Sequence, residues 1–336
     1  MLAACGAPEG APSSSGTSTP STSVTASSSS SGSFADGYGI PEGASPFSGR
    51  PDGAGKPVIV VKIDNTGWAQ PHEGLTAADL VYIEPVEWGL NRIAAVFSAT
   101  LPARVGPVRS ARISDIDLLA QFERPAFAFS GAQEKLLPFL AAAPFYDVSG
   151  QLDGVGYTID SSRKSPYNAF VDPTVLLNQR APDASLSKDI GFVFSDTPPA
   201  GGSPASAARV KWYGSQVDFN WSVDSGDYAV SFNGKPARAV ESASGQHAAT
   251  VVIQYVDQKD SEFGDMYGGK TPVVNSVGTG RALVLRDGQM WETTWSRPTP
   301  QDGTVFTRAD GSRMPFDIGQ PWIVLYENDK EARITP

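Results

Sequence analysis

The chain has 336 residues, of which 40% are hydrophobic and 18% are charged, and its formal net charge is -10. This length suits one large domain or two ordinary ones. The acidic balance, without any block of Lys or Arg, argues against a nucleic-acid groove, because neutralising phosphates needs a clustered basic face. The only cysteine is Cys5 and the only histidines are His72 and His247, so we expect no structural zinc site, no disulfide framework, no metal and no cofactor.

The first residues predict a lipid anchor. Residues 2–5, Leu-Ala-Ala-Cys, resemble the bacterial lipobox, in which the cysteine takes a diacylglyceryl group. Residues 7–33 are nearly all Ser, Thr, Ala, Pro and Gly, a composition that cannot bury enough apolar surface to fold. We therefore expect residues 1–5 to be the remnant of a lipoprotein signal peptide that begins upstream of Met1, and residues 6–45 to be a disordered tether. The alternative is a chance cysteine before an ordinary disordered N-terminus.

This anchor sets the expected location and one partner. Apolar runs such as residues 58–61 and 282–285 have the length of a strand and are far shorter than the roughly 20 residues of a membrane-spanning helix. Lipid on Cys5 is then the predicted attachment to the cell membrane, with the folded part on the extracytoplasmic face.

The pattern after residue 50 changes to short apolar runs broken by turns, which predicts an α/β domain over residues 50–195. Strands are expected at residues 57–65, 80–86, 92–98 and 125–130. The second and third form a hairpin around residues 87–90. Helices are expected from the capping box Ser114-x-x-Asp117 to a point before Pro125, and over residues 132–140 and 172–179.

The second half predicts a β-rich domain over residues 209–336, after a linker or long loop at residues 196–208. Strands are expected at residues 210–213, 217–221, 228–232, 250–255, 282–285, 290–295 and 322–326. Asn233-Gly234 and Asp287-Gly288 stand at hairpin positions. The fold class is therefore α/β (α+β), with a mixed-sheet N-terminal part followed by a mostly antiparallel C-terminal part. The large aromatic residues of these strands are expected in the core rather than on a sugar-binding face: Trp212, Trp221, Trp291, Trp295 and Trp322.

Five blocks of the chain resemble the YerB-like lipoproteins, a family of two adjoining domains of unknown function. The blocks are residues 58–65, 74–82, 106–112, 280–297 and 319–322. The resemblance implies an α/β body with a β-rich C-terminal part and extracytoplasmic placement, and it implies no established reaction. Where the resemblance leads us to expect Pro-His-Asn, this chain has Pro166-Tyr167-Asn168. Tyrosine cannot replace histidine as a base or ligand near neutral pH.

A pair of arginines is the best local candidate for a binding site. Arg109 and Arg112 precede the helix expected near Ser114, and two guanidiniums beside free backbone amides can hold a phosphate or carboxylate. The alternative is that both pair with acidic side chains inside the fold. If the site is real, we expect six side chains to converge on one cleft: Arg109, Arg112, Arg163, Asn168, Asp64 and Glu84.

Catalysis has weaker support, and the catalytic residues are unknown. Asp64, Glu84 and Glu87 can divide acid and base roles, but the odd spacing of the two glutamates puts them on opposite faces of a regular strand. Two S-x-x-K matches, at residues 161–164 and 185–188, lack the other elements of serine acyl transferases. We predict a non-catalytic module that binds an anionic envelope component or a partner protein. A cell-wall hydrolase and a structural scaffold are the alternatives.

Overall fold

The computed structural model describes residues 37–265 and 267–336. Cys5 and most of the predicted tether lie outside these residues. Residues 44–49 are buried, and the Phe47 ring packs edge-on against Phe122 with centroids 5.3 Å apart. Ordered packing therefore begins at the C-terminal end of the stretch that we predicted as a tether.

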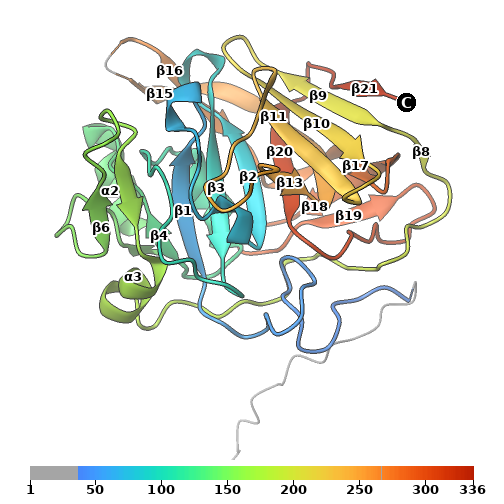
Figure 1. The fold of residues 1–336 in the computed structure, drawn as a ribbon, viewed down its shortest axis with the longest axis horizontal. Helices are drawn as coiled ribbons and strands as arrows, with labels where there is room; N and C mark the ends of the chain where they lie inside the picture. The colour runs from blue at the N-terminus through green and yellow to red at the C-terminus, as the bar shows by residue number, and fades with distance from the viewer. Residues whose placement is uncertain (1–36, 266) are drawn as a thin grey trace, which may run out of the picture. The chain divides into compact units, whose positions relative to one another are not determined.

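One large sheet forms the centre of the described chain (Figure 1). Its strand order is β19-β18-β17-β14-β20-β2-β3-β1-β4-β5, and β8 pairs with β18 at one end. The strands are β1 (Ile59–Asp64), β2 (Leu80–Pro85), β3 (Asn91–Phe97), β4 (Ala126–Ala128), β5 (Tyr146–Asp147), β8 (Ser203–Pro204), β14 (Thr250–Val256), β17 (Gly278–Arg286), β18 (Gln289–Arg297), β19 (Val305–Arg308) and β20 (Pro321–Glu327). Strands from both halves of the chain thus belong to the same sheet.

Three smaller sheets accompany the central one. One has the order β12-β11-β10-β9-β21, with β13 beside β11, and the other two are the hairpins β15-β16 and β6-β7. Their strands are β6 (Tyr157–Ile159), β7 (Ala169–Val171), β9 (Ala207–Lys211), β10 (Gln216–Ser222), β11 (Asp227–Phe232), β12 (Lys235–Pro236), β13 (His247–Ala248), β15 (Gln258–Gly264), β16 (Lys270–Val274) and β21 (Arg333–Thr335). The predicted fold class, a mixed N-terminal sheet followed by mostly antiparallel β structure, is confirmed.

The join between the two halves is the parallel pairing of β20 with β2, and β20 also pairs in parallel with β14 of its own half. Trp322 of β20 lies beside Val81 of β2 and Val251 of β14, and all three side chains are fully buried. Strands that are buried on both faces read as continuous apolar runs, which is why β1, β2, β14 and β20 could be predicted. The sheet nevertheless crosses the division that we expect between residues 50–195 and 209–336.

The helices are short. They are α1 (Ser114–Ala120), α2 (Leu137–Ala142) and α3 (Pro173–Arg180), with 3-10 turns η1 (Gly67–Ala69), η2 (Leu75–Ala77), η3 (Glu87–Gly89) and η4 (Glu134–Leu136). Within the described residues, no helix has the length and apolar character needed to span a membrane. In place of the single helix predicted at residues 132–140, the structure has the 3-10 turn η4 followed by the short helix α2.

The predicted capping box at Ser114 is wrong. Ser114 is the first helical residue of α1, and its hydroxyl makes no cap hydrogen bond. Instead it donates to the carbonyl of Pro272 and accepts from the amide of Val274, both in β16. The hydroxyl was not free to cap because a tertiary partner from the second half of the chain uses it.

Both predicted hairpin turns are present. Asn233 and Gly234 have φ values of 51° and 73°, and Asp287 and Gly288 have φ values of 51° and 67°. A type I′ turn requires positive φ at both central residues, which Asn, Asp and Gly adopt at low cost. Of the five tryptophans expected in the core, Trp212, Trp291, Trp295 and Trp322 are at most 4% exposed, whereas Trp221 is half-buried.

Candidate anion-binding cavity

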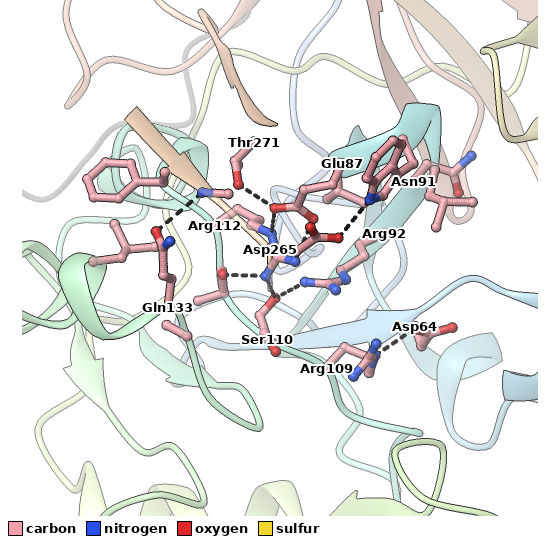
Figure 2. A pocket seen from close by; sticks show the side chains of 18 of the residues that line it. Asp64, Glu87, Asn91, Arg92, Arg109, Ser110, Arg112, Gln133, Asp265 and Thr271 are labelled. Atoms are coloured by element: carbon pink, nitrogen blue, oxygen red, sulfur yellow. Dashed lines mark hydrogen bonds and ion pairs between the residues drawn. The ribbon is translucent and has the colours of Figure 1, made fainter. Parts of the chain in front are cut away.

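A cavity of about 730 Å³ opens at the turn between β2 and β3 (Figure 2). It lies where β1 ends, beside the segment that leads into α1, and the β15-β16 hairpin forms another wall. Its charged lining residues are Asp64, Glu87, Arg92, Arg109, Arg112 and Asp265, and its aromatic ones are Trp88, Tyr167, Phe263 and Tyr267. The volume falls in the usual range of small-molecule sites, about 300–1,000 Å³.

Arg92, in β3, is the most buried cation of this cavity, with 7% of its surface exposed. Its Nη1 donates to the carbonyl of Ser110 at 2.7 Å. Among residues 37–265 and 267–336, no carboxylate lies within ion-pair distance of its guanidinium. Burial, with the nearby charges of Arg112 and Arg109, lowers its pKa to about 9, so the guanidinium is still protonated at neutral pH.

Arg109 pairs with Asp64, the last residue of β1. The Arg109 Nε lies 2.7 Å from Asp64 Oδ2, and the amide of Thr66 donates to Asp64 Oδ1 at 2.7 Å. Burial opposes ionisation of Asp64, but the Thr66 hydrogen bonds and the Arg109 charge outweigh it and lower the pKa of that carboxyl. The Arg109 guanidinium also lies 5.7 Å from the ring centroid of Tyr167. Tyr167, which stands where the family resemblance led us to expect a histidine, therefore lines the cavity.

Arg112 pairs with Glu87, the first residue of η3. Its Nε and Nη2 each donate to a different oxygen of Glu87 at 2.6 Å, which is the bidentate geometry that guanidinium favours with carboxylate. Thr271 of β16 donates its hydroxyl to Glu87 Oε1. Burial would raise the pKa of Glu87, but its contacts with Arg112 and Thr271 lower it.

Asp265 is the remaining acidic group of the lining, and it is on the loop of the β15-β16 hairpin. Its carboxylate accepts from the Trp88 indole Nε1 at 2.8 Å and from the amides of Tyr267 and Gly269 at 3.0 and 2.8 Å. These bonds hold the loop and the indole together. Asp265 forms no ion pair with Arg92.

The structure brings together only part of the predicted site. Asp64, Arg109 and Arg112 line the cavity, and each arginine is also paired with an acidic side chain, as the alternative interpretation had it. Glu84, Arg163 and Asn168 are absent from the lining. The expected convergence of all six residues on one cleft is therefore not found.

Glu84 lies in a buried ionic cluster and not in the cavity lining. It lies on the same face of the sheet as Asp64 and Arg92, because the register pairs both residues with Arg92. There its Oε1 is 2.7 Å from Lys62 Nζ, which also lies 2.6 Å from Asp115 Oδ1 at the start of α1. All three side chains are almost completely buried. Glu84 is thus part of an ionic cluster in the core.

Arg163 and Asn168 lie outside the cavity lining. Arg163 donates to the backbone carbonyls of Ala69 and Pro71 at 3.0 and 2.7 Å. The backbone carbonyl of Asn168 accepts from the amide of Asp160 at 2.8 Å, within the loop between β6 and β7. Both residues support the loop that carries Tyr167, and neither reaches the cavity.

Sequence reasoning missed Arg92 and Trp88 as cavity residues. The available signal for Arg92 was a charged residue that opens an otherwise apolar strand, since charged side chains are rarely buried without a partner. Lys62, between apolar neighbours in β1, carried the same signal. Trp88 was hidden in a turn, where composition alone gives no information about the environment of an aromatic ring.

Comparisons with known proteins place the chain in a family. Residues 47–187 match the "Protein of unknown function (DUF3048) N-terminal domain", and residues 208–323 match the corresponding C-terminal domain. The chain is 26% identical over 293 residues to "Putative lipoprotein YerB" of Bacillus subtilis (strain 168), covering 83% of this chain and 84% of that protein. It also has the fold of the crystal structure of the YerB protein from Bacillus subtilis, with a TM-score of 0.73 and 21% identity over 87% of this chain and 99% of that one. The resemblance seen in the sequence is confirmed, and the chain belongs to the YerB-like DUF3048 family of lipoproteins of unknown function.

Proposed function

We propose that this protein is an extracytoplasmic lipoprotein that binds an anionic component of the cell envelope in the cavity beside Arg92. The observation that carries the proposal is a buried guanidinium that lines an open cavity and contacts no carboxylate of the described residues. Burying a charge is costly unless a partner compensates for it. A carboxylate or phosphate of the ligand supplies that partner.

The neighbouring arginines make the cavity selective for one anionic group. Arg109 and Arg112 are already neutralised by Asp64 and Glu87, so they contribute orientation and hydrogen bonding more than net charge. A guanidinium that uses one nitrogen on the Ser110 carbonyl still has donors for a planar or tetrahedral oxyanion. Asp265 adds a further negative charge to the same lining, so the expected ligand presents no more than one acidic group, at Arg92.

The geometry does not support the hydrolase alternative. Glycoside hydrolysis needs a carboxylic acid whose pKa is raised, facing a second carboxylate across the substrate. The pKa values of Asp64 and Glu87 are lowered, so both are ionised at neutral pH and neither can donate a proton. Burial raises the pKa of Glu84 to about 7, but Glu84 does not line the cavity.

Binding is tested with inorganic phosphate, acetate and N-acetylmuramic acid by titration calorimetry. Arg92→Met keeps the length of the side chain and removes the charge. Hydrogen bonds to charged groups contribute about 1.5–3 kcal/mol, so the Kd for the bound anion is expected to rise roughly 10- to 150-fold. Arg209→Met is the matched control, because Arg209 lies in β9 of the smaller sheet and pairs with Asp218 outside this cavity. Unchanged affinity in a folded Arg92→Met variant would refute the proposal.

The anchor is tested separately. We expect lipid on Cys5 to hold the protein at the membrane, in line with the name of its Bacillus relative. When the gene is expressed in a bacterium that exports and lipidates the wild type, Cys5→Ala is expected to move the protein from the membrane fraction to the soluble fraction. Retention of the variant in the membrane fraction would show that attachment does not depend on this thiol.

A further inference from the structure

Trp88 occupies a backbone position that does not suit a large side chain. It is the first central residue of the β2-β3 turn, with φ 63° and ψ 20°, and Gly89 follows with φ 63°. Turns with positive φ at both central residues favour Asn, Asp or Gly at the first, and a bulky residue there is an outlier. Such strain persists only where surrounding structure holds it, and it concentrates at ligand sites.

The β15-β16 loop is what holds the indole in place. Trp88 Nε1 donates to Asp265 at 2.8 Å, and the ring packs against Gly269 so closely that a Cβ there would be 2.5 Å from Nε1. Even so, 51% of Trp88 is exposed. The result is a fixed aromatic ring with a free surface, at the edge of the cavity that contains Arg92.

A second cavity, of about 540 Å³, meets the first at this residue, since Val86 and Trp88 line both. The two cavities lie on opposite sides of β16, because Thr271 lines the first whereas Lys270 and Pro272 line the second. Any ligand that occupies both must cross the Trp88 ring.

The lining of the second cavity is polar. It includes the carboxylates Asp257, Asp260 and Asp329 and the lysines Lys259 and Lys270. Carboxylates accept from hydroxyl groups, and ammonium groups donate to hydroxyl and carbonyl oxygens. The cavity therefore suits a polar part of a ligand.

These features match the chemistry of a sugar chain. The flat faces of a sugar ring are made of C–H groups, which suit the negative face of an indole ring. Its edges carry hydroxyl and acetamido groups, which suit the polar lining of the second cavity. Arg92 adds a place for one acidic substituent. A purely apolar ligand would leave Arg92 without an anionic partner, and a small anion would leave the Trp88 ring and the second cavity unused.

We infer that the ligand is an acidic oligosaccharide whose charged sugar lies at Arg92, whose chain stacks on Trp88, and whose next sugar lies in the second cavity. This rests on the proposed anion-binding function and names its ligand class. The site is then an extended one, longer than a single sugar, and Trp88 is its central contact.

The experiment compares the full chain with variants by titration calorimetry. The probes are inorganic phosphate, N-acetylmuramic acid, the N-acetylglucosamine–N-acetylmuramic acid disaccharide and its dimeric tetrasaccharide, and neutral chitotetraose. The wild type is expected to bind the tetrasaccharide about tenfold or more tighter than N-acetylmuramic acid, which is about 1.4 kcal/mol or more, and tighter than chitotetraose. Trp88→Asn is expected to remove that advantage while phosphate binding stays unchanged, whereas Trp88→Phe retains most of it.

Controls separate loss of fold from loss of binding. Asn suits the turn position of Trp88, so the melting temperature of Trp88→Asn is not expected to fall. Trp68→Asn is the matched control, since Trp68 is 75% exposed and lines neither cavity. If phosphate binds but the oligosaccharides bind no tighter than N-acetylmuramic acid, or Trp88→Asn binds them like the wild type, the oligosaccharide inference is overturned and the anion site stands. If no anionic probe binds, both are overturned.

Discussion

The buried cluster of Lys62, Glu84 and Asp115 makes the stability of the protein depend on pH in a way that Glu84→Gln should reveal. The Lys62 ammonium lies 2.7 Å from Glu84 and 2.6 Å from Asp115, and one cation cannot neutralise two carboxylates. Burial, reinforced by the charge of Asp115 and opposed by Lys62, raises the pKa of Glu84 to about 7. The folded protein therefore holds a proton that the unfolded chain releases.

The sign and size of the effect follow from this difference. Between pH 4.5 and about 7 the folded state binds more protons at Glu84 than the unfolded state, so the free energy of unfolding falls as pH rises. The stabilisation is fully present below pH 4.5 and is lost above pH 7. A pKa difference between 4.5 and about 7, at about 1.36 kcal/mol per pH unit, corresponds to about 3 kcal/mol.

Glutamine keeps the shape of the side chain and an oxygen for Lys62 but cannot titrate. Urea unfolding followed by tryptophan fluorescence at pH 4.5, 6 and 7.5 gives the free energy of unfolding of both proteins. Relative to the wild type, Glu84→Gln is expected to gain about 3 kcal/mol between the lowest and highest pH. Glu331→Gln, at a carboxylate that is 73% exposed, serves as the control with no such change. If the free energies of unfolding of Glu84→Gln and the wild type differ by the same amount at all three pH values, Glu84 does not carry the proposed proton in the folded state.

Three further changes test the fold. Burial lowers the pKa of His72 to about 4. The stability that neutral His72 contributes is therefore present above pH 6.5 and is lost as the pH falls toward 4. In urea unfolding, His72→Gln is expected to lack this loss of stability between pH 6.5 and 4. Gly288→Ala is expected to lower the free energy of unfolding, measured in urea, by about 1 kcal/mol or more, because residue 288 has a positive φ. Gly234→Ala is expected to cost less. Residue 234 also has a positive φ, but a Cβ there meets no atom within 4 Å, whereas a Cβ at 288 would lie 3.0 Å from Trp221. Arg297, fully buried, donates to carbonyls of residues 117, 300 and 302. Arg297→Met leaves these acceptors unpaired, which should cost about 3 kcal/mol and lower the melting temperature measured by calorimetry; an unchanged melting temperature would contradict this role.

The fold could be predicted wherever a local pattern decides the structure. The continuous apolar runs of β1 and β14 indicate buried strands, and Asp287-Gly288 specifies a tight hairpin. What could not be predicted is the partner of a strand. The parallel pairing of β20 with β2 brings together Val81 and Trp322 from opposite halves of the chain, and no local spacing encodes that pairing. The capping box predicted at Ser114 was wrong for the same reason, because its hydroxyl bonds to β16 in the second half of the chain.

The site could be predicted only where its residues are close in sequence. Arg109 and Arg112 were found because they are three residues apart before a helix, and their pairing with acidic groups was one of the two open interpretations. The role of Arg92 depends on a competition that sequence does not display. Asp64 is its register neighbour in β1, yet Asp64 forms its ion pair with Arg109. Because Asp64 pairs with Arg109, Arg92 has no carboxylate partner in the described chain and is a candidate contact for the ligand.

Three unfavourable features lie around the two adjoining cavities, and each lowers the stability of the free protein. Trp88 is in a strained backbone conformation, although Asn233 and Asp287 follow the turn rule at the two hairpin turns that the sequence predicts. In the described part of the chain, Arg92 is a buried cation without an ion pair, and Trp212 Nε1 is a buried donor without an acceptor. Locally consistent sequences depart from such rules mainly at functional sites. An acidic oligosaccharide that pairs with Arg92 binds only the folded state, so at 100 times its Kd it should raise the free energy of unfolding by about 2.7 kcal/mol. N-acetylmuramic acid at the same concentration, with a tenfold higher Kd, should raise it by only about 1.4 kcal/mol.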